Sequence, residues 1–191
     1  MENNKIQLEK LRQKAQKCTN CILCQTRNKV VFSDGCETAP VMFIGEAPGQ
    51  NEDNTGIPFI GRAGQLFRKY LFETGYGNND FYIANTVKCR PPKNRKPAPK
   101  EKESCRHFLD EQIKLINPKI IVLVGSCALE SFIKDKKLTI TKARGKIFEI
   151  DNKKFIPIFH PSYLLRYHST LEGSPRYYFK KDLETIKEMV T

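Results

Sequence analysis

The 191-residue sequence has the length of one domain, and we predict a single domain over residues 1–191. Hydrophobic residues make up 39% of the chain, and no apolar run approaches the roughly 20 residues that span a bilayer, which argues against a membrane protein. The 33 basic against 21 acidic residues give a formal charge of +12. This excess favours a polyanionic partner, most simply nucleic acid, although a lysine-rich composition alone would also produce it.

The N-terminal sequence MENNKIQLEK lacks the apolar stretch of a secretory signal. We therefore expect the protein in a reducing cytoplasm. In that compartment its seven cysteines are better interpreted as metal ligands or core thiols than as disulfides.

The first half of the chain predicts strands in alternation with helices. Short apolar, β-rich runs predict strands at Lys29–Phe32, Val41–Gly45 and Phe81–Val87. Helices are expected at residues 3–17, which are polar, and at Gly61–Gly75, which carries apolar residues at helical spacing. The stretch Arg90–Pro99 contains four prolines among basic residues and predicts a stiff, exposed loop.

The second half continues the alternation. The nearly continuous apolar run Ile120–Gly125 predicts a central parallel strand that is covered on both faces. Helices are expected at Pro99–Ile116, after Ser126 as a capping residue, and at residues 176–189. The remaining segments are a β-hairpin of Lys146–Ile150 and Phe155–Phe159 around the turn Asp151–Lys154, and a loop at His160–Arg166.

This alternation of strands and helices implies an α/β fold with a mostly parallel sheet. Ligands of such sheets bind at the carboxyl ends of the strands. The most informative stretches follow predicted strands, and they are Gly45–Gly64, Asn85, Arg90–Pro99 and His160–Arg166. We therefore expect the functional site at this edge of the sheet.

The cysteine spacing indicates a metal site. Cys18, Cys21 and Cys24 form a C-x2-C-x2-C pattern, and Cys89 and Cys105 follow far downstream. One close pair and two distant cysteines can form a four-thiolate site that fixes the N-terminal segment to the domain, and such a site suits zinc or an iron–sulfur cluster. Spacing alone does not separate the two, and Cys24 competes with Cys18 or Cys21. We interpret the other two cysteines, Cys36 and Cys127, as ordinary residues.

The segment MFIGEAPGQNEDNTGIPFIGRAG, residues 42–64, is the richest in chemistry. Its glycines allow backbone amides to approach a ligand closely, and Glu46, Glu52 and Asp53 add carboxylates. Phe59 places an aromatic ring beside these acids, which suits a stacked planar base. A solvated acidic turn with Phe59 in the core is the alternative.

Four motifs in order carry a family resemblance. GEAPGQNED, PFIGRAG, NTVKCRPPKNRKP and HPSYLLR resemble the iron–sulfur uracil-DNA glycosylases of family 4, and the N-terminal CTNC pair and Cys105 also match. The resemblance implies a three-layer α/β/α sandwich around a central four-stranded, mostly parallel sheet. It also implies a structural [4Fe-4S] cluster on Cys18, Cys21, Cys89 and Cys105.

The resemblance further implies hydrolysis of the bond between uracil and deoxyribose, which leaves an abasic site. Asn85 matches the residue that reads uracil, since its amide can donate to O4 and accept from N3–H, and Phe59 matches the ring that stacks on the flipped base. His160 matches the histidine that faces uracil O2, and we expect it to act as a neutral donor beside the backbone amides of Gly45–Ala47.

A carboxylate would orient the attacking water in this reaction. Glu46 is the first choice and Glu52 the second. Some relatives carry an Asp one position after the residue that aligns with Glu46, where this chain has Ala47.

DNA contacts are implied at two segments. The family's loop that enters the minor groove is matched by Ser162, Tyr163, Leu164, Leu165 and Arg166. Leu164 or Leu165 would be the wedge that fills the space of the flipped base. Basic side chains in the proline-rich loop would contact phosphates, and they are Arg90, Lys93, Arg95 and Lys96. The implied partner is single- or double-stranded uracil-containing DNA, bound by a monomer, with a sliding clamp as a further candidate partner.

Three alternatives remain beside this interpretation. A non-catalytic DNA-binding module would keep the cluster and the basic loop, and an electron carrier would show a reversible redox couple without base release. A relative that traps the abasic product covalently would carry a Gln after the first Gly and a His-containing insertion. This chain has Glu46 at that position and no such insertion in RPPKNRKP, so we expect turnover.

Overall fold

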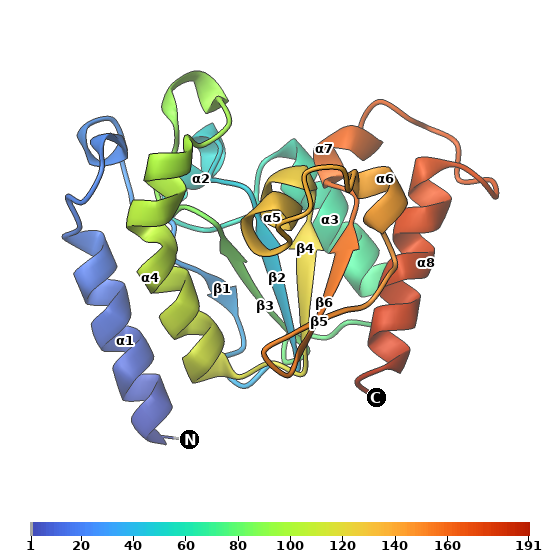
Figure 1. Ribbon diagram of the computed structural model, residues 1–191, viewed down its shortest axis with the longest axis horizontal. Helices are drawn as coiled ribbons and strands as arrows, with labels where there is room; N and C mark the ends of the chain where they lie inside the picture. Colours follow the sequence, from blue (N-terminus) through green and yellow to red (C-terminus); the bar gives the residue numbers. More distant parts are fainter. Residues whose placement is uncertain (1) are drawn as a thin grey trace.

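Four parallel strands form the centre of a six-stranded sheet in the computed structural model, which describes residues 2–191 (Figure 1). The parallel strands are β2 (Val41–Gly45), β3 (Phe81–Asn85), β4 (Ile120–Val124) and β6 (Lys153–Ile158). Two short antiparallel strands, β1 (Asp34–Gly35) and β5 (Phe148–Ile150), complete the order β1-β3-β2-β4-β6-β5. The predicted α/β class is confirmed, but the sheet has six strands rather than four because a short strand pairs at each edge.

Helices cover both faces of the sheet, which gives three layers (Figure 1). One face packs against α1 (Glu2–Gln16), α4 (Pro99–Ile116) and α5 (Ser126–Phe132), and the other against α3 (Arg62–Glu73) and α8 (Pro175–Glu188). The remaining short α-helices are α2 (Gln50–Thr55), α6 (Ile140–Ala143) and α7 (Pro161–Leu164), and two 3-10 helices lie at Ile22–Gln25 and Pro92–Asn94. No helix within residues 2–191 is long and apolar enough to cross a membrane.

The strands are apolar on both faces because both faces are covered. In β2, Met42 and Ile44 belong to the core beneath α4, whereas Val41 and Phe43 belong to the core beneath α3. All five residues of β4 are buried in the same way. Burial of each large apolar side chain contributes about 1.5–3 kcal/mol, so the parallel strands form the rigid centre on which the loops stand.

Helix α4 shows how the sequence marks element ends. Pro99 occupies its first turn, and the Glu101 carboxylate accepts a hydrogen bond from the Ala98 amide at 2.7 Å. The helix ends at Asn117, whose φ of 47° lies in the left-handed region and directs the chain into β4. The helix bounds agree with the predicted Pro99–Ile116.

Other expected elements differ from the structure. Lys29–Phe32 is not a strand, because this segment makes a backbone bond from Val31 to the Lys88 carbonyl at 2.8 Å but no ladder. Ser126 does not cap α5, since Gly125 holds the cap position. The expected loop His160–Arg166 contains the helical turn α7.

Candidate active site

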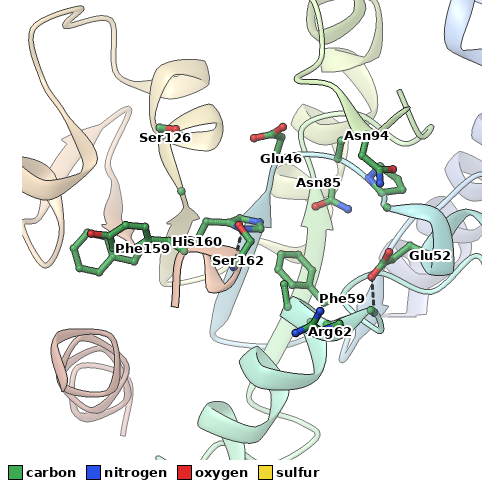
Figure 2. Close-up of a pocket in the computed structure, with 18 of the residues that line it drawn as sticks. Glu46, Glu52, Phe59, Arg62, Asn85, Asn94, Ser126, Phe159, His160 and Ser162 are labelled. Atoms are coloured by element: carbon green, nitrogen blue, oxygen red, sulfur yellow. Dashed lines mark hydrogen bonds between the residues drawn. The ribbon is translucent and has the colours of Figure 1, made fainter. Parts of the chain in front are cut away.

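A cavity of about 640 Å³ opens at the carboxyl ends of the four parallel strands (Figure 2). Residues that follow each strand line it: Glu46 after β2, Asn85 at the end of β3, Ser126 after β4 and His160 after β6. This is the edge of the sheet at which the sequence predicted the site, and the side chains converge there because parallel strands end at the same edge.

Asn85 forms the polar part of the cavity floor. The residue is 2% exposed, and its Oδ1 atom has no hydrogen-bond partner within residues 2–191. An unpaired buried polar atom destabilises a protein by about 1–3 kcal/mol, so such an atom needs a functional reason. Because Asn85 lines the cavity, a ligand with an N–H group can supply the missing donor.

Gly45 allows Asn85 and Phe59 to approach each other. A Cβ atom at Gly45 would lie 2.5 Å from Asn85 Oδ1 and 2.6 Å from Phe59 Cζ. Gly45 pairs with Asn85 across the two strands and lies behind the lining of the cavity, whereas Ala47 lines it. The glycine is therefore required by the space between two side chains of the site.

Phe59 presents its ring to the cavity from a strained backbone. Its φ is 55°, and the segment is held by Arg68, whose guanidinium donates to the Phe59 and Pro58 carbonyls at 2.9 Å. The ring is 6% exposed, and its centroid lies 6.2 Å from that of His160. A planar ligand on the cavity floor therefore contacts an aromatic ring whose position is fixed.

His160 is held in one tautomer when neutral. Its Nδ1 atom accepts a hydrogen bond from the Ser162 amide at 3.2 Å, and Ser162 Oγ lies 2.7 Å from the same atom. The proton of the neutral ring therefore resides on Nε2, where it can be donated to a ligand. Burial lowers the pKa of His160 to about 4, so the ring is neutral near pH 7.

The two carboxylates of the cavity have different surroundings. Glu52 accepts backbone hydrogen bonds from Ile60 at 3.0 Å and Gly61 at 2.8 Å, so its carboxylate fixes the loop that carries Phe59. Glu46 lines the cavity, and burial raises its pKa above the ordinary value. Within residues 2–191, no hydrogen bond or ion pair holds the Glu46 carboxylate, whereas Glu52 uses its Oε1 atom to hold the loop.

The segment after His160 separates the two candidate wedge residues. Leu164 is 0% exposed and belongs to the core beneath α3, so this leucine is not available as a wedge. Leu165 is partly buried and Arg166 is exposed, while Ser162 lines the cavity. Of the two leucines expected as the wedge, only Leu165 is therefore accessible to DNA.

The basic loop is partly committed to internal contacts. Arg95 lines the cavity, yet its guanidinium pairs with both oxygens of Glu101, at 2.6 and 2.8 Å. Lys96 pairs with Glu130 at 2.7 Å. Lys93 is exposed and no acidic partner pairs with it in the described chain, which makes it the most available cation of this loop.

Several cavity residues were not predicted from the sequence. Asn94 lines the cavity, and its Oδ1 atom accepts from Arg90 Nε at 2.7 Å. Arg62, the first residue of α3, and Phe159 also line the cavity (Figure 2). Tyr163, which the sequence placed in the DNA-contacting loop, lines it as well. Arg62 and Asn94 lie inside the motifs PFIGRAG and PPKNRKP. The motifs did not indicate that these two residues line the cavity.

A second, narrow cavity collects the cysteines. Five of them line it, and they are Cys18, Cys21, Cys24, Cys89 and Cys105. Arg27 donates to Cys89 Sγ at 3.3 Å, and the Lys88 amide donates to Cys105 Sγ at 3.3 Å. Cys127 is buried elsewhere, in agreement with its interpretation as a core residue.

The cysteines of this cavity are the donor set of a four-thiolate site. Within residues 2–191, no three Cys, His, Asp or Glu side chains are arranged to hold one metal ion. In a four-iron cluster each thiolate binds a different iron, so the ligands stand farther apart. Lys88 also lines the cavity, and its buried ammonium group donates to the Asn85 carbonyl at 3.0 Å.

The geometry agrees with comparisons to known proteins. Residues 32–187 match the model of the uracil DNA glycosylase superfamily. A type-4 uracil-DNA glycosylase of Thermotoga maritima is 45% identical over 96% of this chain and 94% of its own length. The chain belongs to the type-4 uracil-DNA glycosylase family. Type-4 relatives from Archaeoglobus fulgidus (39% identity, 86% of this chain and 85% of theirs) and Sulfurisphaera tokodaii (38%, 95% and 84%) support the same assignment.

Family membership explains why the cavity combines an aromatic face with buried polar atoms. A base-excising enzyme must hold one extruded base and reject the others. In this member of the family, the residues after the four parallel strands place an aromatic face and buried polar atoms around one cavity.

Proposed function

We propose that this protein releases uracil from DNA by hydrolysis of its N-glycosidic bond and leaves an abasic site. The unpaired, buried Oδ1 atom of Asn85 beside the Phe59 ring supports the proposal most directly. Uracil N3–H supplies the donor that Oδ1 lacks, and the Asn85 NH2 group donates to uracil O4. Cytosine has an acceptor at N3 and a donor at C4, so it would leave both Asn85 groups unsatisfied.

The reaction needs negative charge to be stabilised on the departing base. Water attacks C1′ of the deoxyribose, the C1′–N1 bond breaks, and its electron pair moves onto the uracil ring. His160 donates from Nε2 to uracil O2, a role that its hydrogen bond from Ser162 and its lowered pKa support. Such a neutral donor stabilises the anion without delivering a full proton.

Glu46 orients the attacking water in this proposal. Its carboxylate also favours positive charge on the sugar, and the proton lost by the water passes to it. The partly buried position of Glu46 in the cavity and the structural contacts of Glu52 support this choice.

We propose a [4Fe-4S] cluster on Cys18, Cys21, Cys89 and Cys105. When bound, the cluster supplies a cross-link between the N-terminal segment, the end of β3 and α4, and no electrons to the reaction. Cys24 lines the same cavity and stays an alternative to Cys18 or Cys21. The shared cavity and the two hydrogen bonds to sulfur support the assignment.

The proposed substrate is uracil-containing DNA, single- or double-stranded, bound by a monomer in the cytoplasm. Leu165 acts as the wedge in double-stranded substrates, and Lys93, Arg90 and Arg166 contact phosphates. Of the four cations predicted in the basic loop, Arg95 and Lys96 instead anchor that loop through Glu101 and Glu130.

The test uses an oligonucleotide with one uracil, incubated with purified protein and then treated with alkali. Oligonucleotides with thymine or cytosine at the same position are the controls. We expect cleavage at uracil alone. Intact strands after incubation with protein that shows full iron–sulfur absorbance would favour a binding module instead.

A further inference from the structure

Three aromatic rings form a row that runs from the cavity wall to the protein surface. The ring centroids of Phe159 and Tyr163 lie 5.2 Å apart, and those of Tyr163 and Tyr167 lie 4.8 Å apart. Phe159 and Tyr163 line the cavity, and the three aromatic residues are spaced four apart in the sequence, with Tyr163 in α7. The row is therefore continuous with the proposed uracil site.

Exposure increases along this row. Phe159 is 7% exposed, whereas Tyr163 is 37% and Tyr167 38% exposed. Burial of the Tyr163 and Tyr167 rings in the core would stabilise the protein more, because exposed apolar surface contributes no hydrophobic stabilisation. The outer two rings are therefore available to a partner with a planar, apolar face.

The charge around the row selects the kind of partner. Arg166 and His168 flank Tyr167 and are exposed, and none of the ion pairs within residues 2–191 involves Arg166. Arg62 adds a cation at the rim of the cavity. Aromatic side chains beside cations suit a nucleic acid strand, whose bases stack on the rings while its phosphates contact the charges.

The Tyr163 and Tyr167 rings are inclined by 56°, so a base can stack on the face of one of them. We propose that Tyr167, supported by Tyr163, forms a stacking platform for an unpaired base that neighbours the flipped uracil on the same strand. The inference rests on the proposed function and adds a subsite to it. The faces of a paired base are covered by its neighbours in the duplex, so the platform acts on single-stranded DNA. A base in a single strand lacks the stacking and pairing of a duplex, and stacking on the platform compensates for that loss. The platform therefore gives single-stranded substrates affinity beyond that of the uracil pocket.

A tryptophan reporter tests the contact directly, because the chain contains no tryptophan. The variant Tyr167→Trp carries the reporter on the platform. Phe72→Trp is the matched control at an exposed aromatic position at the far end of α3, 55% exposed. The probe is a uracil-free thymidine strand of about 12 nucleotides, within the length that single-strand sites cover. We expect quenching in Tyr167→Trp, none in Phe72→Trp, and little quenching in either variant with the corresponding duplex.

An affinity measurement completes the test. Tyr167→Ala should weaken binding of the single strand roughly ten-fold while duplex binding changes less than about two-fold, and Tyr167→Phe should keep wild-type affinity for both. Unquenched Tyr167→Trp, or equal losses on single strand and duplex in Tyr167→Ala, would overturn the platform. These readouts use no uracil, so failure of the platform is distinguishable from failure of base release, which the wild-type protein reports.

Discussion

The floor and the rim of the active-site cavity differ in how far their side chains are buried. On the floor, Asn85 and Phe59 are 2% and 6% exposed, and both pack so closely on Gly45 that a Cβ atom there would clash with them. The rim is formed by the two segments that continue from cavity-lining residues, 90–96 and 162–168. Its residues Lys93, Arg166 and Tyr167 are exposed. The floor thus suits the recognition of single atoms of one base, whereas the rim suits contacts that any DNA sequence can provide.

This difference teaches how binding and selectivity divide in the proposed enzyme. A change on the floor should alter which base is released and how fast. A change on the rim should alter affinity, salt dependence or strand preference and leave the choice of base intact.

Asn85→Asp should have the largest effect, because it replaces the NH2 donor of the floor with an acceptor. We expect uracil release to fall by about 10²–10⁴-fold and weak cytosine release to emerge, measured as single-turnover rates on otherwise identical oligonucleotides. Unchanged uracil release would remove Asn85 from base recognition.

His160→Gln should lower uracil release by about 10²–10³-fold at every pH, because the donor to the leaving base is misplaced. Since the pKa of His160 is about 4, the wild-type rate should show no inflection near the ordinary value of 6.5. The pKa of Glu46 is raised, so as the pH falls its carboxylate is protonated before the His160 ring. The rate of uracil release should decline as this carboxylate takes up its proton. Glu46→Gln should abolish this acid limb, and an inflection near 6.5 that disappears in His160→Gln would contradict the account.

The two leucines of the rim segment should behave differently. Leu164→Ala should lower the free energy of unfolding by about 2–5 kcal/mol, because Leu164 is fully buried. Leu165→Ala should keep wild-type stability and lose roughly ten-fold activity on double-stranded substrates, with less loss on single strands. Equal losses on both substrates in Leu165→Ala would end its assignment as the wedge.

Lys93→Ala should have the smallest effect. Removal of one phosphate contact should weaken DNA binding uniformly across sequences and reduce the slope of log affinity against log salt by about 1. Arg95→Ala offers a contrast, since Arg95 is paired with Glu101 and its loss should release the basic loop rather than remove one salt-dependent contact. An unchanged salt slope in Lys93→Ala would show that Lys93 does not contact a phosphate.

The sequence predicted the elements that form the site well where periodicity is strong. The strand Val41–Gly45 and the helix Pro99–Ile116 are confirmed at both ends, because an apolar run and a proline mark them. Helix α2 (Gln50–Thr55) was missed, since QNEDNT has no apolar face and its fold depends on hydrogen bonds to Asp53 and Glu52. The edge strand β1 spans two residues, which is too short for any pattern.

The predicted site residues mostly lie around one cavity, but their tasks could not all be read from the motifs. Glu46 and Glu52 look equivalent in the sequence, and only the backbone contacts of Glu52 to Ile60 and Gly61 separate them. Leu164 and Leu165 are adjacent leucines at the end of α7, and only the direction of each side chain decides which one is buried. Such differences arise from tertiary packing, which a one-dimensional pattern does not contain.

The most direct test of the account is the amount of free uracil released per mole of protein from an excess of uracil-containing duplex, measured by mass spectrometry. The account predicts many moles of uracil per mole of protein, with no free cytosine or thymine from matched duplexes. Release of no uracil would contradict the catalytic proposal, and release of one mole that stays linked to trapped protein would indicate a covalent product instead of turnover.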